Sequence, residues 1–146
     1  IANKSTLFFS NNKNQFFSLD IRTGNLNWEQ KINSNLRPTL IDDYIFTVSL
    51  EGYLIIIEKN AGNIIRITDA FKNFKPKKRK NIKPTGFIVG NNNIYLTTNH
   101  GRLLVIDLIT GTVLNIIKID NKKITRPSVI NENMFIITDN SIIKLK

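Results

Sequence analysis

Residues 18–28 decide the fold, and they read Ser18-Leu19-Asp20-Ile21-Arg22-Thr23-Gly24-Asn25-Leu26-Asn27-Trp28. The pair Thr23-Gly24 predicts a hairpin turn between two strands, because glycine takes a positive φ without steric cost. Asp20 stands four residues before the glycine, where its carboxylate can accept hydrogen bonds from turn amides that strand pairing leaves unused. Trp28 has a large apolar ring, which we expect to pack between neighbouring sheets.

The turn recurs at Ala61-Gly62 and Thr110-Gly111. In every copy an acidic residue stands four positions before the glycine, and an apolar strand begins 17 positions before it. A second marker precedes each new unit, at Arg37-Pro38, Lys83-Pro84 and Arg126-Pro127, and its prolines are 46 and 43 residues apart. Proline suits the first residue of a strand because it lacks a donor. Two markers in phase therefore predict units of roughly 40–45 residues with four short strands, the size of a propeller blade.

We therefore predict an all-β fold of propeller blades, each with four antiparallel strands. Branched and aromatic runs alternate with turn formers along the chain, and no segment shows a sustained apolar period of 3.6 residues. The first blade is expected to lack its inner strand, and the last its outer strand. The expected divisions of the single propeller fragment 1–146 are a partial blade at 1–36, blades at 37–70 and 83–120, a basic inter-blade loop at 71–82 and a partial blade at 126–146.

The composition excludes several classes of protein. The chain has 146 residues, 41% of them hydrophobic and 22% charged, which is typical of a globular chain. The absence of Cys excludes disulfide scaffolds, iron–sulfur sites and thiol nucleophiles, and the single His excludes multi-histidine metal sites. The longest purely apolar run, 54–57, is far shorter than the ~20 residues that cross a bilayer. Because the chain begins with Ile rather than Met, we expect a processed or excised piece, with any targeting signal elsewhere.

The charge is strongly basic, with 21 Lys and Arg against 11 Asp and Glu and a formal net charge of +10. A surplus of this size favours a nucleic-acid or anionic-surface partner. A second interpretation competes with it. Ile, Asn and Lys make up 61 of the 146 residues, and all three have A/T-rich codons, so a biased genome would supply much of the surplus without any anionic partner.

One segment departs from the repeat, and we call residues 71–83 the basic segment. It contains seven Lys and Arg residues, two Phe and one Pro. Such a cluster can bind an acidic protein, anionic lipid headgroups or nucleic acid, of which nucleic acid is least favoured because no helix or stacking platform is evident. The alternative is a solvated lysine-rich loop. The candidate partner-binding residues here are Phe71, Phe74, Lys75, Lys77, Lys78, Arg79 and Lys80.

Three further cations, Arg37, Lys83 and Arg126, each precede one of the repeated prolines. In a propeller, equivalent positions lie on one face around the channel mouth, so these residues are candidates for binding an acidic loop of a partner. They are equally well explained as structural positions whose side chains cap neighbouring carbonyl groups.

Residues 18–28 resemble the tryptophan-docking motif of quinoprotein-like propellers, Ala-x-Asp-x-x-Thr-Gly-x-x-x-Trp. The third unit lacks the Trp, which is Asn115, and the second keeps only the acid Glu58 and Gly62, with Arg66 at the Trp position. The resemblance implies a structural role for the matching residues and no catalytic role. The residues that match the motif in the first and third units are Asp20, Thr23, Gly24, Trp28, Asp107, Thr110 and Gly111.

The same resemblance implies the C-terminal half of a propeller of about eight blades, whose ring is closed by an N-terminal strand. The chain has degenerate motifs and no Cys. In these features it resembles the BamB-type scaffold lipoproteins of the outer-membrane β-barrel assembly machinery more than the PQQ-dependent dehydrogenases. This implies a non-enzymatic, periplasmic, outer-membrane-associated scaffold without cofactor or metal. Its partners would be the β-barrel assembly machinery and, through unpaired strands, a second copy of the chain; nucleic acid is unlikely. The alternatives are a fragment of a PQQ-dependent dehydrogenase and a ligand-sensing domain of a larger receptor.

Overall fold

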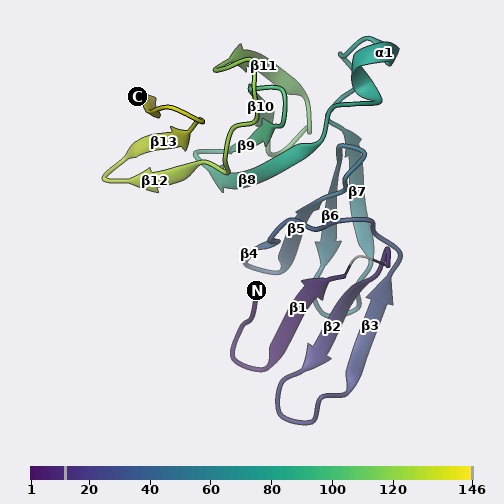
Figure 1. Cartoon of the computed structure of the whole chain (residues 1–146). Helices are drawn as coiled ribbons and strands as arrows, with labels where there is room; N and C mark the ends of the chain where they lie inside the picture. The colour runs from purple at the N-terminus through teal and green to yellow at the C-terminus, as the bar shows by residue number, and fades with distance from the viewer. Residues whose placement is uncertain (12, 146) are drawn as a thin grey trace. The chain divides into compact units, whose positions relative to one another are not determined.

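The computed structural model describes residues 1–11 and 13–145, and these residues are almost entirely β-strand and turn (Figure 1). Antiparallel pairing joins the strands into four sheets within this described part of the chain. The predicted all-β class, with four-stranded antiparallel sheets, is therefore confirmed. Asn12 of the expected first blade and Lys146 of the expected last blade lie outside the described residues. No helix within the described ranges is long and apolar enough to cross a membrane.

The chain divides into two compact units, Ile1–Asp69 and Ala70–Lys146. The first unit contains a three-stranded sheet in the order β1-β2-β3 and a four-stranded sheet in the order β4-β5-β6-β7. Its strands are β1 (Thr6–Ser10), β2 (Phe16–Asp20), β3 (Leu26–Gln30), β4 (Thr39–Ile41), β5 (Tyr44–Val48), β6 (Tyr53–Glu58) and β7 (Ile64–Asp69).

The second unit repeats the plan with a four-stranded sheet in the order β11-β10-β9-β8 and a three-stranded sheet in the order β12-β13-β14. A short helix, α1 (Pro76–Arg79), precedes these sheets in the sequence. The strands are β8 (Pro84–Gly90), β9 (Asn93–Thr98), β10 (Arg102–Asp107), β11 (Val113–Lys118), β12 (Ser128–Ile130), β13 (Asn133–Ile137) and β14 (Ile142–Leu145).

The first residues of the chain pair with the inner edge of β1. Ala2 bridges Leu7, and the backbone N–H groups of Ile1 and Phe8 each donate to the other residue's carbonyl oxygen at 2.8 Å. The Asn3 side chain folds the chain back, because its Oδ1 accepts the backbone N–H of Thr6 (2.7 Å). This is a single bridge and not a strand, so the sheet remains three-stranded.

The sequence repeat appears as repeated backbone geometry. A β-bulge lies two residues before each turn acid, after Ser18, Ile56 and Val105. The glycines of the three turns have φ values of 73°, 76° and 74°, a left-handed conformation that favours glycine. The turn and the bulge together set the same register in the strand pairs β2–β3, β6–β7 and β10–β11.

Helix α1 contradicts the expectation that no helix lies in the basic segment. It is a single turn that starts at Pro76, and proline favours the first helical position because its φ is already helical and no N–H is needed there. The N–H of Arg79 donates to the carbonyl oxygen of Lys75 (3.0 Å). The helix contains no buried residue, so it leaves no apolar periodicity in the sequence.

Candidate functional site

Trp28 fills the space between the two sheets of the first unit. Its ring stacks on Phe16, with centroids 6.0 Å apart and planes 9° from parallel, and it lies 6.0 Å from the ring of Phe8. The indole Nε1–H donates to the carbonyl oxygen of Lys59 (2.9 Å), in the turn between β6 and β7. Trp28 therefore joins β3 of one sheet to the glycine turn of the next, and it belongs to the hydrophobic core.

The acidic residues of the repeated turns are bound to their own turns. Asp20 accepts the backbone N–H and the hydroxyl of Thr23 (2.7 and 2.9 Å), and Asp107 accepts the same two groups of Thr110 (2.6 and 2.8 Å). Glu58 accepts two backbone amides of its turn, both at 2.7 Å. These contacts give the carboxylates a structural role.

The same contacts shift the titration of two carboxyls. The backbone amide of Thr23, followed by its hydroxyl, lowers the pKa of Asp20. The amides of Ala61 and Asn60 lower the pKa of Glu58. In both cases a hydrogen bond to the charged form favours ionisation.

Both ends of the basic segment are held in place within the fold. Phe71 is fully buried and meets Phe74 edge to face, with centroids 5.7 Å apart. Ile82 is 2% exposed. Asn99 clamps the C-terminal end, because its Oδ1 accepts the N–H of Lys83 (2.7 Å) and its Nδ2 donates to the carbonyl oxygen of Asn81 (2.9 Å). Phe71 thus anchors the segment in this structure and does not face a partner.

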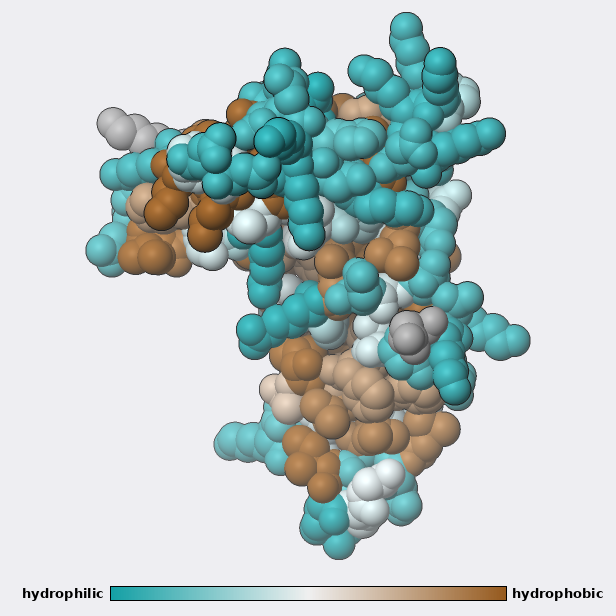
Figure 2. All heavy atoms as spheres, viewed as in Figure 1, coloured by the Kyte–Doolittle hydropathy of each residue, from teal (hydrophilic) through white to brown (hydrophobic). Residues whose placement is uncertain are grey.

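The outer surface of the basic segment is made of cations. Arg79 is half-buried, and Phe74 and Pro76 accompany the lysines at the surface. Hydrophilic side chains project over the region of α1, at the upper right of Figure 2. The segment contains no Asp or Glu, so it offers no acid of its own to offset its charge. The exposed cations are Lys72, Lys75, Lys77, Lys78, Lys80 and Lys83.

The two units differ sharply in charge. Ile1–Asp69 contains seven basic and seven acidic residues, whereas Ala70–Lys146 contains 14 basic and four acidic residues. The whole net charge of +10 therefore belongs to the second unit. Half of the basic residues of that unit lie in the basic segment, so a uniform codon bias does not explain their distribution.

The three cations before the repeated prolines have different surroundings. Arg37, in the first unit, and Lys83, in the second, are exposed. Arg126 is half-buried, and its Nε–H donates to the carbonyl oxygen of Phe87 (2.9 Å). Arg126 thus does what the structural interpretation of these positions requires. That the three share one face stays a prediction.

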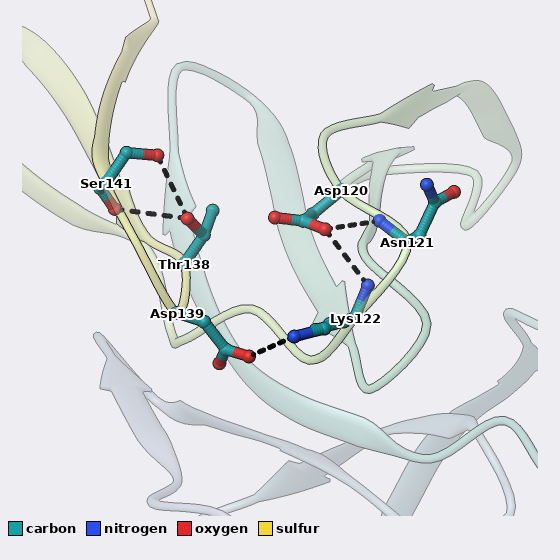
Figure 3. Close-up of polar contacts among 6 residues, drawn as sticks. All are labelled: Asp120, Asn121, Lys122, Thr138, Asp139 and Ser141. Carbon is teal, nitrogen blue, oxygen red and sulfur yellow. Dashed lines mark hydrogen bonds and ion pairs between the residues drawn. The ribbon is translucent and has the colours of Figure 1, made fainter.

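The sequence patterns did not predict one polar contact of the second unit. The connection between β11 and β12 approaches the turn between β13 and β14, where Lys122 Nζ lies 3.2 Å from Asp139 Oδ2 (Figure 3). Asp120 Oδ1 accepts the backbone N–H of Lys122 (3.1 Å), and the Thr138 and Ser141 hydroxyls lie 3.0 Å apart. Of these contacts, the Lys122–Asp139 ion pair links the connection to the last hairpin.

The second unit contains a cavity at the place that Trp28 fills in the first. It has a volume of about 790 Å³, and Leu103, Val105 and Met134 are among its lining residues. Leu103 corresponds in the repeat to Phe16, and Asn115 corresponds to Trp28. Asn115 is exposed and pairs with Val105, as Trp28 pairs with Ser18. Two rings of the first unit, Phe16 and Trp28, are thus replaced by smaller side chains at the cavity, whereas Phe8 corresponds to Tyr95, which lines it.

Comparison with known proteins gives a family match over part of the chain. Residues 1–68 match the family described as outer membrane protein assembly factor BamB. No curated protein matches the chain in sequence.

Solved structures match nearly all of it. BamB from Moraxella catarrhalis superposes with a TM-score of 0.78 at 14% identity over 99% of this chain and 40% of that one. The computationally designed Ika4 protein gives 0.77 at 12% identity, covering 99% of this chain and 86% of the design. The β-propeller domain of Myceliophteria thermophila Cps50 (Swd1) gives 0.70 at 12% identity, covering 93% and 46%. The chain thus spans less than half the length of the natural proteins it matches.

These matches agree with the repeat, the bulges and the glycine turns described above. The fold of the chain is that of a β-propeller, and its residues 1–68 are similar to the BamB family.

Proposed function

We propose that this chain is a non-enzymatic scaffold that binds protein partners, and that the basic segment contacts an acidic surface of such a partner. By likeness to BamB, the setting is the periplasmic side of the outer membrane and the partner is the β-barrel assembly machinery. The family match over residues 1–68 and the fold match to a BamB structure support a scaffold of this type.

The observation that carries the proposal is the anchored basic segment. Its lysines are exposed while Phe71, Ile82 and the Asn99 clamp hold the backbone in place. A surface that is already ordered loses less conformational entropy when it binds. The positive charge of its exposed lysines speeds encounter with an acidic surface and makes the association dependent on salt.

The turn carboxylates are consistent with a scaffold. Asp20 and Glu58 use their oxygens to hold turn amides, and their lowered pKa values keep them ionised at neutral pH. A general base needs a pKa near the working pH and access to substrate. Neither carboxyl meets the first requirement.

The test neutralises the exposed lysines of α1 and its flank. We expect Lys77→Gln, Lys78→Gln and Lys80→Gln together to weaken binding to the periplasmic domains of the assembly machinery by about tenfold at low salt, and less at high salt. The matched control removes the same charge from the first unit through Lys4→Gln, Lys13→Gln and Arg22→Gln, all exposed positions. Equal affinities for both triple variants would contradict the role of the basic segment. Stoichiometric retention of pyrroloquinoline quinone with calcium would support the dehydrogenase alternative instead.

A further inference from the structure

Strand β7 is an unusually apolar sheet edge. It is the last strand in the order β4-β5-β6-β7, so it has a strand neighbour on one side only among the described residues. Ile64, Ile65 and Ile67 are 40%, 56% and 56% exposed. Native proteins usually protect such edges with Lys, Pro or short strands. Strand β7 is six residues long and contains neither Lys nor Pro.

The strands equivalent to β7 in the neighbouring sheets, β3 and β11, expose fewer large apolar residues. Strand β3 contains one large exposed hydrophobic residue, Leu26, among polar and charged neighbours. Strand β11 also contains one, Leu114, and ends at Lys118. Leu26 corresponds in the repeat to Ile64 and Leu114 to Ile65, so each of these strands exposes one apolar residue at an equivalent position. Among these three strands, only β7 combines three exposed apolar residues.

A groove lies beside this edge within the first unit. It has a volume of about 500 Å³, and its apolar lining includes Ile32, Ile55 and Ile67. Ile55 and Ile67 are cross-strand partners in the β6–β7 pair, so their side chains share one face of the sheet. Lys31 and Glu51 are also among the lining residues. A side chain on the same face of a strand added beside β7 would therefore project next to Ile67 and into the groove.

We propose that β7 binds an extended segment of a partner polypeptide as an added strand, with one apolar side chain of the segment in the groove. The unpaired N–H and C=O groups of an edge are complementary to an extended backbone, and pockets beside the edge select alternate side chains. The proposal rests on the scaffold function, and it specifies the form in which a partner binds.

Charge argues that this partner segment is apolar and uncharged. The first unit has equal numbers of acidic and basic residues, and the groove lining includes one residue of each sign. An acidic partner surface is expected to bind the basic segment, whereas nothing at β7 favours one sign of charge in a partner. The basic segment and β7 therefore select different features of a partner.

The test uses an end-blocked, fluorescently labelled eight-residue peptide of alternating valine and threonine, followed by anisotropy. We expect it to bind the intact chain, and Ile65→Lys and Ile67→Lys each to weaken binding by about tenfold. The matched control is Leu114→Lys. Leu114 lies on β11, at the position that corresponds to Ile65 in the next copy of the sequence repeat, and is 58% exposed. Absence of peptide binding, or equal weakening by Leu114→Lys, would overturn the proposal.

Backbone pairing is tested separately with N-methylated peptides. Only alternate N–H groups of an added strand point toward β7, so methylation of one alternate set is expected to abolish binding while the other set retains it. Equal binding by both methylated peptides would overturn edge pairing. A wild-type dimer in light scattering that Ile67→Lys converts to a monomer would overturn it in favour of a second copy. The triple variant at Lys77, Lys78 and Lys80 should bind the peptide normally, so either proposal can fail without the other.

Discussion

The indole of Trp28 lies so close to Gly62 that a Cβ atom on Gly62 would come 2.5 Å from Cδ2 of the ring. Gly62 is therefore required for two reasons, its positive φ of 76° and the approach of a ring from the preceding sheet. Gly24 has a similar φ of 73° but no atom within 4 Å of the same hypothetical Cβ. Gly24 is therefore required only by the backbone conformation of its turn, whereas Gly62 is required by its turn and by the packing of Trp28 against it.

The first prediction compares these glycines. Gly24→Ala should lower the free energy of unfolding by about 1 kcal/mol, the cost of a left-handed alanine. Gly62→Ala should cost about 1–3 kcal/mol more, because the ring must move from its packed position. Chemical denaturation measures both variants. Equal losses would show that the Trp28 contact adds nothing to the cost.

The second prediction concerns pH. The pKa of Asp20 and of Glu58 is lowered in the folded chain by hydrogen bonds from turn amides. A carboxyl with a lowered folded pKa stabilises the fold above its unfolded pKa of about 4, and this contribution is lost as the pH falls through the folded value. Asp20→Asn and Glu58→Gln should therefore be less stable than the wild type at pH ~7 and approach it at pH ~2. Thermal unfolding across this range checks the result, and a gap that stays constant with pH would contradict it.

The third prediction concerns the Asn99 clamp. Asn99→Ala removes hydrogen bonds to Asn81 and Lys83, so we expect a loss of about 1–2 kcal/mol in the free energy of unfolding. The amide of Lys83 should also exchange its hydrogen faster, because its acceptor is gone. Hydrogen-exchange mass spectrometry of residues 71–83 measures this. Unchanged exchange there would contradict the role of the Asn99 side chain, since the backbone bond from Asn99 N–H to the carbonyl oxygen of Lys83 (3.0 Å) remains in the variant.

The fourth prediction fills the cavity of the second unit. Asn115 pairs with the cavity-lining residue Val105, so a tryptophan at position 115 should reach the space that Trp28 occupies in the first unit. We expect Asn115→Trp to raise the free energy of unfolding of the second unit by about 1 kcal/mol. The substitution is made in a Trp28→Phe background, so that the new ring reports its own unfolding. A fully solvent-exposed emission spectrum would show that the ring stays outside the cavity.

Local chemistry explains which parts of this fold were readable in the sequence. The acid, the glycine and the 17-residue offset define a turn whose contacts span three or four residues, so Asp20, Glu58 and Asp107 indicate it directly. The docking of Trp28 followed from its position after that turn. The propeller repeat was therefore predictable from short-range patterns.

Other features depend on contacts that leave no local pattern. Helix α1 buries no residue, so no periodicity marks it. Phe71 lies among lysines and was expected at the surface, yet the fold buries it completely. Asn99 acts on residues 16 and 18 positions away through its side chain, and nothing in its neighbourhood indicates that role. How many blades the ring contains stays a prediction.

The place of Trp28 also makes the two units optically distinct. It is the only tryptophan of the chain, and it lies in the buried core of the first unit against Phe8 and Phe16. Indole emission from the unmodified chain therefore reports the opening of one unit and is silent about the other. A comparison of that emission with far-ultraviolet circular dichroism would reveal whether the neutral and the basic unit melt together or in sequence.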